Sequence, residues 1–247
     1  MSTVLNSLSL ENRNKLKDQF QKYLYREPIV TMREFVDSPK YLNLKGKVYP
    51  RVMWMLEQID QPYIREANLS LGKGAGKSTA VVITLARMIY RTLCYNDIHS
   101  YLGLIPGSPI FVINMSVSSK QAKSVIFNLL AQIIANSPWF LGKCDIRASE
   151  IEFVHNLSML SGSSSSTSFL GLNTIAACMD EVDYFMDNSN RVIAQEIYDE
   201  LKGSMETRFP DDHKLLLISS PASEDSFLVR KINEDRKEGE MIDLTGV

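Results

Sequence analysis

The chain has 247 residues, of which 45% are hydrophobic and 23% charged, and its formal net charge is −2. This composition is ordinary for a globular protein, and the charge excludes a generally basic nucleic-acid coat. The three cysteines are odd in number and widely spaced, so neither a disulfide framework nor a zinc site is expected. No apolar run approaches the ~20 residues that a membrane-spanning helix needs, so no membrane partner is expected.

Residues 1–65 are predicted to form a helical extension. Thr31 and Glu34 have the spacing of a capping box, in which each side chain satisfies a backbone N–H at the start of a helix. Trp54 and Trp139 both lie beside apolar neighbours in the sequence, so we interpret them as core residues.

The glycine-rich stretch 72–79 lies between a short apolar run, 67–71, and a strongly helical run, 78–93. A turn of this kind points its backbone N–H groups inward and adds the positive end of a helix dipole, which predicts a phosphate-binding loop. Lys77 is expected to reach the β- and γ-phosphates of a nucleotide, and the hydroxyl of Ser78 to bind Mg²⁺. The predicted nucleotide-binding residues are Gly72, Lys73, Gly74, Ala75, Gly76, Lys77, Ser78 and Thr79.

Strands and helices alternate through the rest of the chain. The expected elements are a turn-rich loop at 96–109, a strand at 110–114, a helix that Ser118 or Ser119 caps and Pro138 stops, with its apolar positions at 122–134, a hairpin at 151–160, a Ser- and Gly-rich loop at 161–168, strands at 174–179 and 215–218, and helices at 191–208 and 227–232. The loop at 161–168 cannot pack as a core element and is expected to be mobile. The alternation predicts a mainly parallel sheet that helices cover on both faces.

Two carboxylates, Asp180 and Glu181, directly follow the apolar strand 174–179. The carboxyl ends of parallel strands are where open α/β sheets bind ligands. Asp180 is predicted to hold the Mg²⁺ shell, and Glu181 to orient and deprotonate the water that attacks the γ-phosphate. A hydrolase needs this second acid, whereas an enzyme that transfers the phosphoryl group to a free substrate does not.

The strand 215–218 ends in Ser219, Ser220 and Pro221 at the same expected edge of the sheet. One interpretation is that Ser219 or Ser220 senses the γ-phosphate and passes its loss to the next helix. The other is a turn followed by a helix cap at Ser223. The sequence leaves both interpretations open.

Together, the loop 72–78, Gly171-Leu172-Asn173 shortly before Asp180-Glu181, and Ser219-Ser220-Pro221 resemble the ATPase domain of large terminase subunits. These proteins are the DNA-packaging motors of tailed phages and related viruses. The resemblance implies an α/β, RecA-like P-loop ATPase with an N-terminal helical extension. The implied division is an extension at 1–65, an ATPase core at 66–235, and a tail or start of a linker at 236–247.

By this resemblance the chain is an Mg²⁺-dependent ATPase, with Glu181 and Lys77 as its catalytic residues and Lys73 as an additional basic residue of the loop. The family moves viral double-stranded DNA into a procapsid, as a homo-oligomeric ring working with a portal protein and a small terminase subunit in the host cell cytoplasm. Terminases usually carry a nuclease domain after the ATPase. A chain ending at Val247 has no room for that domain, so no nuclease activity is expected.

The sequence departs from the family's pattern at two points. Many members have Gln near position 51, where this chain has Arg51, which puts the adenine contact in question. Ring ATPases commonly supply an arginine to a neighbour's γ-phosphate, and the sequence does not choose among the candidates Arg147, Arg191 and Arg208. The alternative function is a helicase or another DNA-translocating P-loop motor, which would need a second RecA-like domain.

Overall fold

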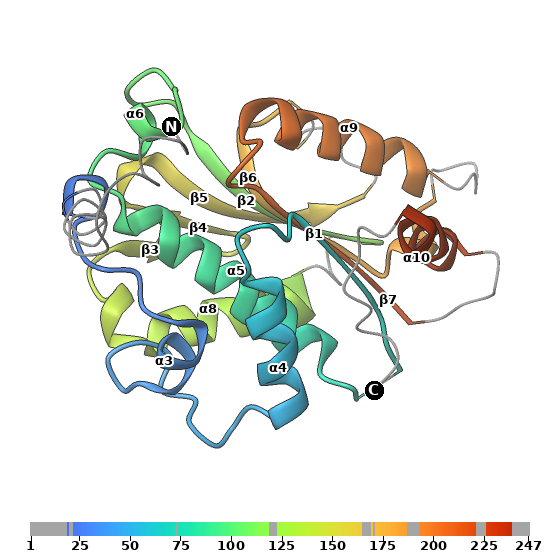
Figure 1. The fold of residues 1–247 in the computed structure, drawn as a ribbon, viewed down its shortest axis with the longest axis horizontal. Helices are drawn as coiled ribbons and strands as arrows, with labels where there is room; N and C mark the ends of the chain where they lie inside the picture. Colours follow the sequence, from blue (N-terminus) through green and yellow to red (C-terminus); the bar gives the residue numbers. More distant parts are fainter. Residues whose placement is uncertain are drawn as a thin grey trace, which may run out of the picture.

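The computed structural model describes residue 19 and residues 22–72, 74–118, 123–164, 169, 171–186, 193–220 and 226–238. A seven-stranded sheet runs through this part of the chain, with helices packed on both faces (Figure 1). The predicted α/β class is therefore confirmed. Within the described ranges, no helix combines the length and the apolar character needed to cross a membrane.

The sheet has a parallel part and a short antiparallel part. Its strands are β1 (Glu66–Ser70), β2 (Ile110–Ser116), β3 (Cys144–Ile146), β4 (Glu150–Phe153), β5 (Leu157–Ser163), β6 (Thr174–Asp180) and β7 (Lys214–Ser219). They lie in the order β1-β7-β6-β2-β5-β4-β3. The first five strands in this order pair in parallel, and β4 and β3 continue the sheet antiparallel. The carboxyl ends of β1, β7 and β6 consequently meet at one edge.

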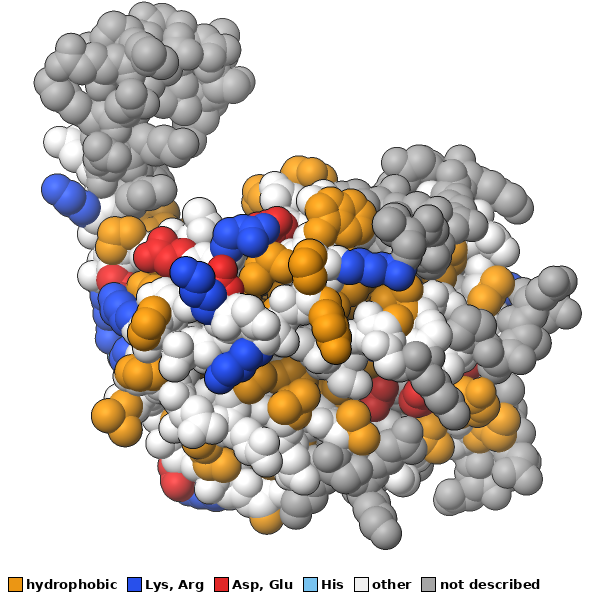
Figure 2. All heavy atoms as spheres, turned by 90° about the horizontal axis from the view of Figure 1, so that it is seen from below, with side chains coloured by type: hydrophobic (Ala, Val, Ile, Leu, Met, Phe, Trp, Pro, Cys, Tyr) orange, Lys and Arg blue, Asp and Glu red, His pale blue; other side chains and the backbone are white. Residues whose placement is uncertain are grey.

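The helices divide between the two faces of the sheet (Figure 1). They are α3 (Met32–Asp37), α4 (Pro50–Ile59), α5 (Lys77–Cys94), α6 (Ile98–Tyr101), α8 (Asn128–Asn136), α9 (Ala194–Arg208) and α10 (Phe227–Glu238). One face carries α3, α4, α5 and α8, and the other carries α9 and α10. Figure 2 looks onto the side that α3, α4 and α8 form.

Strand β7 shows how the sequence builds two cores from one sheet. All six of its residues are buried, and successive side chains point to opposite faces. Leu216 and Ile218 belong to the apolar cluster under α4 and α5, whereas Leu215 and Leu217 belong to the cluster under α9 and α10. A strand covered on both faces needs apolar residues at every position, which explains the unbroken run Leu215-Leu216-Leu217-Ile218.

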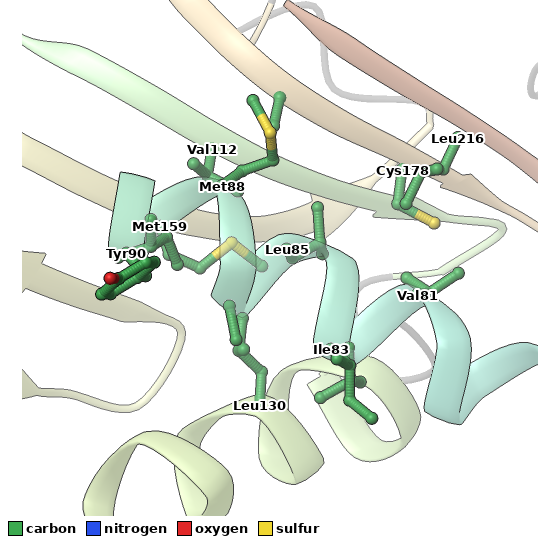
Figure 3. Close-up of a cluster of buried hydrophobic side chains, with 14 of the residues drawn as sticks. Val81, Ile83, Leu85, Met88, Tyr90, Val112, Leu130, Met159, Cys178 and Leu216 are labelled. Carbon is green, nitrogen blue, oxygen red and sulfur yellow. The ribbon is translucent and has the colours of Figure 1, made fainter. Parts of the chain in front are cut away.

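Helix α5 is the centre of the larger core. It is buried almost throughout, as its apolar residues on more than one side require. Figure 3 shows Val81, Leu85 and Met88 directed toward the sheet side chains Val112, Cys178 and Leu216, with Ile83 and Leu130 on another side of the helix. The helix that begins at the phosphate-binding loop is therefore fixed by packing on all sides.

Helices α3 and α4 pack against α5 in the same apolar cluster. The hydroxyl of Thr31 accepts a hydrogen bond from the backbone N–H of Glu34 at 3.2 Å, as the capping box predicts. Trp139 is buried, but Trp54 is 39% exposed, so the interpretation of Trp54 as a core residue was wrong. It lies on the outer side of α4, whose inner side is filled by Val52, Met53, Met55, Leu56 and Ile59. The predicted boundary at residue 65 stays a prediction.

A buried lysine ties the end of α4 to the start of β7. The Nζ of Lys214 donates hydrogen bonds to the carbonyls of Ile59, at 2.6 Å, and Gln61, at 3.4 Å, and also to that of Ile64. Burial lowers the pKa of Lys214 to about 7. The contact with Ile59 satisfies a carbonyl that the end of α4 leaves without an intrahelical partner, and the other two hold the connection from α4 to β1.

Two predicted loops contain regular structure. The segment 96–109 includes α6, because the side chain of Asp97 accepts from the backbone N–H of Ser100 and caps a short helix. At 161–168, residues 161–163 continue β5, because the parallel strand β2 extends to Ser116 and offers them backbone partners. Residues 165–168 lie outside the described residues. The hairpin at 151–160 is confirmed, with His155 and Asn156 at positive φ in its turn.

One helix start differs from the prediction, and one strand was not predicted. Helix α9 begins at Ala194 rather than at position 191, since the N–H of Ile193 bonds the carbonyl of Phe185 instead. The predicted helix after Ser118 or Ser119 is described from Lys123 onward, where a π-helical turn, Lys123–Phe127, precedes α8, and its start lies outside the described residues. The three-residue strand β3 at the sheet edge was not predicted, because it is too short and exposed to show a pattern.

Candidate nucleotide-binding site

The glycine-rich loop joins β1 to α5 at the carboxyl edge of the sheet. Gly74 and Gly76 have φ of 79° and 89°, a conformation that glycine adopts without a side-chain penalty. Gly76 is the N-cap of α5 and supplies no side-chain hydrogen bond, so the first N–H groups of the helix are left for an anion. Lys73 lies outside the described residues, and its predicted contact with phosphate stays a prediction.

Gly76 also sets how closely helix α4 approaches the loop. A Cβ atom built at this position would lie 2.4 Å from Cγ2 of Val52, in the first turn of α4. Real Cβ atoms do not approach other heavy atoms this closely, so a side chain at position 76 would force the two elements apart. The loop is therefore supported from behind by α4.

Lys77 begins α5, and its ammonium group points across the sheet edge. The Nζ of Lys77 donates a hydrogen bond to the hydroxyl of Ser220 at 2.9 Å and another to the carbonyl of Leu71. Ser78 and Thr79 follow in the first turn of α5 and are half-buried. The predicted phosphate-binding cation is thus held at the loop, beside the end of β7.

The two predicted acids end strand β6. Asp180 is only 6% exposed, and Glu181 has a left-handed backbone with φ 56° and ψ 45°. A non-glycine residue in this region is uncommon and marks a position held by its surroundings. The Oε2 atom of Glu181 accepts hydrogen bonds from the N–H of Ser220, at 3.2 Å, and from the hydroxyl of Ser219, at 3.4 Å.

Ser220 consequently joins the loop lysine to the second acid. Its hydroxyl accepts from Lys77 and its backbone N–H donates to Glu181. Three segments that are far apart in the sequence meet here, since β1, β7 and β6 are neighbours in the sheet. The hydrogen bonds from Lys77 through Ser220 to Glu181 therefore connect the loop to the ends of β7 and β6.

The environment of Asp180 works against its negative charge. Burial is the main cause that raises the pKa of Asp180 to about 6, and the neighbouring Glu181 raises it further, while the charge of Lys77 opposes the rise. A carboxyl group in such a position is stabilised by any cation that binds next to it.

Replacing Asp180 with Asn is expected to stabilise the ligand-free chain at pH 8. The folded-state pKa of about 6 lies above the ordinary 3.8, so the protonated form stabilises the fold below pH 3.8, and this contribution is lost as the pH rises through 6. Asn mimics the protonated form at all pH values. We expect a gain in unfolding free energy of up to ~3 kcal/mol at pH 8 and little change near pH 4, measured by urea denaturation.

The exposed carboxylate of Asp211 provides the matched control, because its side chain is 89% exposed. Asp211→Asn should change the stability little at either pH. If the Asp180→Asn variant were less stable than wild type at pH 8, or gained equal stability at both pH values, the burial cost assigned to the charged form of Asp180 would be contradicted.

The side chains predicted to hold Mg²⁺ are of the right chemical kind. The hydroxyl of Ser78 and the carboxylate of Asp180 are hard oxygen donors, which Mg²⁺ prefers, and it usually takes its remaining ligands from water and phosphate. Across the described ranges, no group of three His, Cys, Asp or Glu side chains is placed to hold a metal ion. Both residues are oxygen donors of the kind that Mg²⁺ prefers, and their role stays a prediction.

Asp183 is a residue of the site that the sequence did not indicate. Its Oδ1 atom accepts a hydrogen bond at 2.7 Å from the N–H of Leu228, in the first turn of α10. The short 3₁₀ turn Val182–Tyr184 is thereby linked directly to that helix. Its position three residues after Asp180 was the only available signal, and the partner comes from a distant part of the chain.

The three candidate arginines have different surroundings. Arg147 forms ion pairs with Asp145 and Glu152, at 3.2 and 2.6 Å, on the antiparallel end of the sheet. Arg208 donates to the carbonyls of Gly171 and Leu172, just before β6 begins, and so lies at the edge opposite the loop. Arg191 lies outside the described residues. The described candidates both hold contacts within the chain, and neither is brought to the loop.

The fold and the loop define a P-loop nucleotide-binding domain. The chain belongs to the family described as "Uncharacterized protein MJ0330, N-terminal P-loop domain", whose model matches residues 8–246. Membership of this family implies nucleotide binding, and together with the fold it supports NTPase activity. Comparison with curated protein sequences found no match.

Solved structures with a similar fold include two phage terminases. The HK97 bacteriophage large terminase superposes with a TM-score of 0.55 at 16% identity, over 78% of this chain and 37% of that protein. The large terminase ATPase domain of Thermus phage P74-26 gives a TM-score of 0.50 at 16% identity, over 74% of this chain and 68% of that domain. The predicted fold of a terminase ATPase domain is thus confirmed. The chain spans little more than a third of the HK97 protein.

Proposed function

We propose that the chain is the ATPase domain of a large terminase, which hydrolyses ATP to drive viral double-stranded DNA into a procapsid. The observation that carries the proposal is the hydrogen-bonded connection from Lys77 through Ser220 to Glu181. In this proposal Lys77 is the phosphate-binding cation and Glu181 the base, and the hydrogen bonds join both to the end of a neighbouring strand. A domain that only bound a nucleotide would need the cation but not the other two.

In this proposal the residues of the loop 72–79 bind the phosphates of ATP. Ser78 and Asp180 would hold Mg²⁺, which would neutralise part of the phosphate charge. Glu181 accepts a proton from water as the water oxygen bonds to the γ-phosphorus. The bond from the γ-phosphorus to the bridging oxygen breaks, and ADP leaves with the electron pair. Lys77 stabilises the negative charge on the transferred group.

The same contacts provide a route from hydrolysis to movement. Ser219 and Ser220 end β7 and contact Glu181, so a change at the γ-phosphate position alters the contacts of that strand end. Asp183 links the turn after Glu181 to α10. The proposed coupling element is therefore Ser219 and Ser220, and α10 is the helix that responds.

The proposed setting is that of a packaging motor. The chain would act on double-stranded DNA as a homo-oligomeric ring, with a portal protein and a small terminase subunit, in the host cell cytoplasm. An arginine of the neighbouring subunit, from among Arg147, Arg191 and Arg208, would complete the site. Within the chain, we propose an ATPase core at 66–235 between an extension at 1–65 and a tail at 236–247.

Phosphate release from ATP by the purified chain tests this function. We expect turnover with Mg²⁺, a fall to background when EDTA removes the metal, and faster turnover when duplex DNA is present. The result that would contradict an ATPase is the absence of Mg²⁺-dependent release with and without DNA. Stimulation by single-stranded DNA alone, accompanied by strand separation, would instead support the alternative of a helicase.

A further inference from the structure

A group of basic and aromatic side chains covers the connector before α4 and the first turns of that helix. We call it the basic connector and define it as Lys45, Lys47, Tyr49, Arg51 and Trp54. All five side chains are exposed, with Tyr49 at 74% and Trp54 at 39%. Figure 2 looks onto this side of the molecule, where blue Lys and Arg side chains lie among orange hydrophobic ones.

The packing of the connector fixes its side chains outward. Leu44 and Val48 pack against the large apolar cluster, which turns the lysines between them to the outside. In α4, Val52 and Met53 are buried, so the side chains at positions 51 and 54 share the opposite, outer side. The exposure therefore follows from the fold.

The cations of the basic connector have no ion-pair partner in the part of the chain that the structure describes. No acidic residue occurs between Asp37 and Glu57. Among the described residues, none lies within ion-pair distance of the three cations Lys45, Lys47 and Arg51. Two other cations near this segment do have acidic partners: Arg33 pairs with Glu57 at 2.8 Å, and Lys40 pairs with Glu27 at 3.2 Å. Unpaired cations interleaved with exposed aromatic rings are typical of surfaces that bind nucleic acid.

This surface adjoins the nucleotide site. Val52, next to Arg51 in α4, lies against the N-cap Gly76 of the loop so closely that a Cβ at position 76 would meet it at 2.4 Å. Of the basic connector, Arg51 and Trp54 lie on α4 itself, so a ligand that binds these two residues contacts the helix that packs against the loop.

We propose that the basic connector binds the sugar–phosphate backbone of double-stranded DNA. The three cations contact phosphates, and the rings of Tyr49 and Trp54 pack against the sugars. We choose DNA as the occupant on the basis of charge: the chain as a whole is weakly acidic, whereas this segment carries three exposed cations that have no acidic partner among the described residues. The inference rests on the proposed function, since it assigns a DNA contact to the same motor.

The test compares two double variants with the same net charge. Lys45→Ala with Lys47→Ala removes two cations of the basic connector, and Lys22→Ala with Arg230→Ala removes two exposed cations elsewhere. Binding of a short fluorescent DNA duplex is measured by anisotropy over a range of salt concentrations. We expect the first variant to bind about tenfold more weakly near ~0.1 M salt, with a salt slope lower by about two, and the second to bind like wild type.

The two tryptophans provide a second readout that does not depend on charge. Trp54 is exposed in the basic connector and Trp139 is buried, so duplex DNA should change the fluorescence of Trp54. The change should persist in Trp139→Phe and vanish in Trp54→Phe. Equal loss of binding in both double variants, wild-type binding by the Lys45 and Lys47 variant, or no duplex binding by the wild type would each overturn the proposal.

ATP turnover without DNA separates this proposal from the proposed function. The Lys45 and Lys47 variant should keep the wild-type rate, because neither residue belongs to the nucleotide site. A raised KM for ATP in this variant with unchanged DNA binding would overturn the DNA contact and leave the ATPase intact. Wild-type chain that binds DNA through these lysines but releases no phosphate would overturn the motor and leave the contact.

Discussion

ATP turnover is expected to fall by about 10³-fold when Glu181 is replaced with Gln, while the affinity for nucleotide stays nearly unchanged. Gln has the same shape, and its carbonyl oxygen still accepts from the N–H of Ser220, so the strand end keeps its contact. The amide cannot take a proton from water. Single-turnover kinetics and the equilibrium binding of a fluorescent ATP analogue separate the two effects.

An exposed glutamate on α9 provides the matched control for this variant. Glu200→Gln removes the same charge far from the loop and should leave turnover and affinity unchanged. If Glu181→Gln lost affinity together with turnover, the residue would belong to the binding of ATP and not to the activation of water. Unchanged turnover would remove its catalytic role altogether.

The second large effect on ATP turnover is expected when Lys77 is replaced with Ala. We expect turnover to fall by ~10²–10³-fold and nucleotide affinity to fall as well, because the ammonium stabilises phosphate charge before and during the reaction. Lys77→Arg should have little more turnover than Lys77→Ala, since a planar guanidinium cannot take the place of a compact ammonium beside the hydroxyl of Ser220. Phosphate release and nucleotide binding are measured on the same preparations.

The fold of the Lys77 variant has to be checked, because the side chain also contacts Leu71 and Ser220. Thermal unfolding should show a midpoint close to that of wild type. Lys22→Ala, an exposed lysine outside the site, serves as the control for the loss of one positive charge. Undiminished turnover in a folded Lys77→Ala variant would contradict the proposed ATPase site.

Most of the fold could be predicted from local patterns in the sequence. The apolar run of β7 and the deeply buried α5 followed directly from hydrophobic periodicity, and the glycine-rich loop followed from its place between a strand and a helix. The acids Asp180 and Glu181 could be placed at the site because parallel strands end at one edge. These inferences needed only the order of elements along the chain.

What the sequence could not indicate depends on contacts between distant segments. The bridge through Ser220 needs the neighbouring positions of β1, β7 and β6, and the link from Asp183 to Leu228 joins residues 45 positions apart. The left-handed backbone of Glu181 likewise has no local cause in its residue type. The prediction that Trp54 is a core residue was wrong because its apolar neighbours in the sequence lie on the opposite side of α4.

Helix α4 contacts the loop at one of its ends and strand β7 at the other. Its first turn lies against Gly76 of the loop, and the carbonyl of its last residue, Ile59, accepts a hydrogen bond from Lys214 at the beginning of β7. The other end of β7 carries Ser219, which contacts Glu181. Helix α4, the loop, β7 and Glu181 are therefore connected by a continuous series of contacts. We expect a displacement of α4 to change its contacts with both Gly76 and Lys214, and so to alter the loop and the strand that ends beside Glu181.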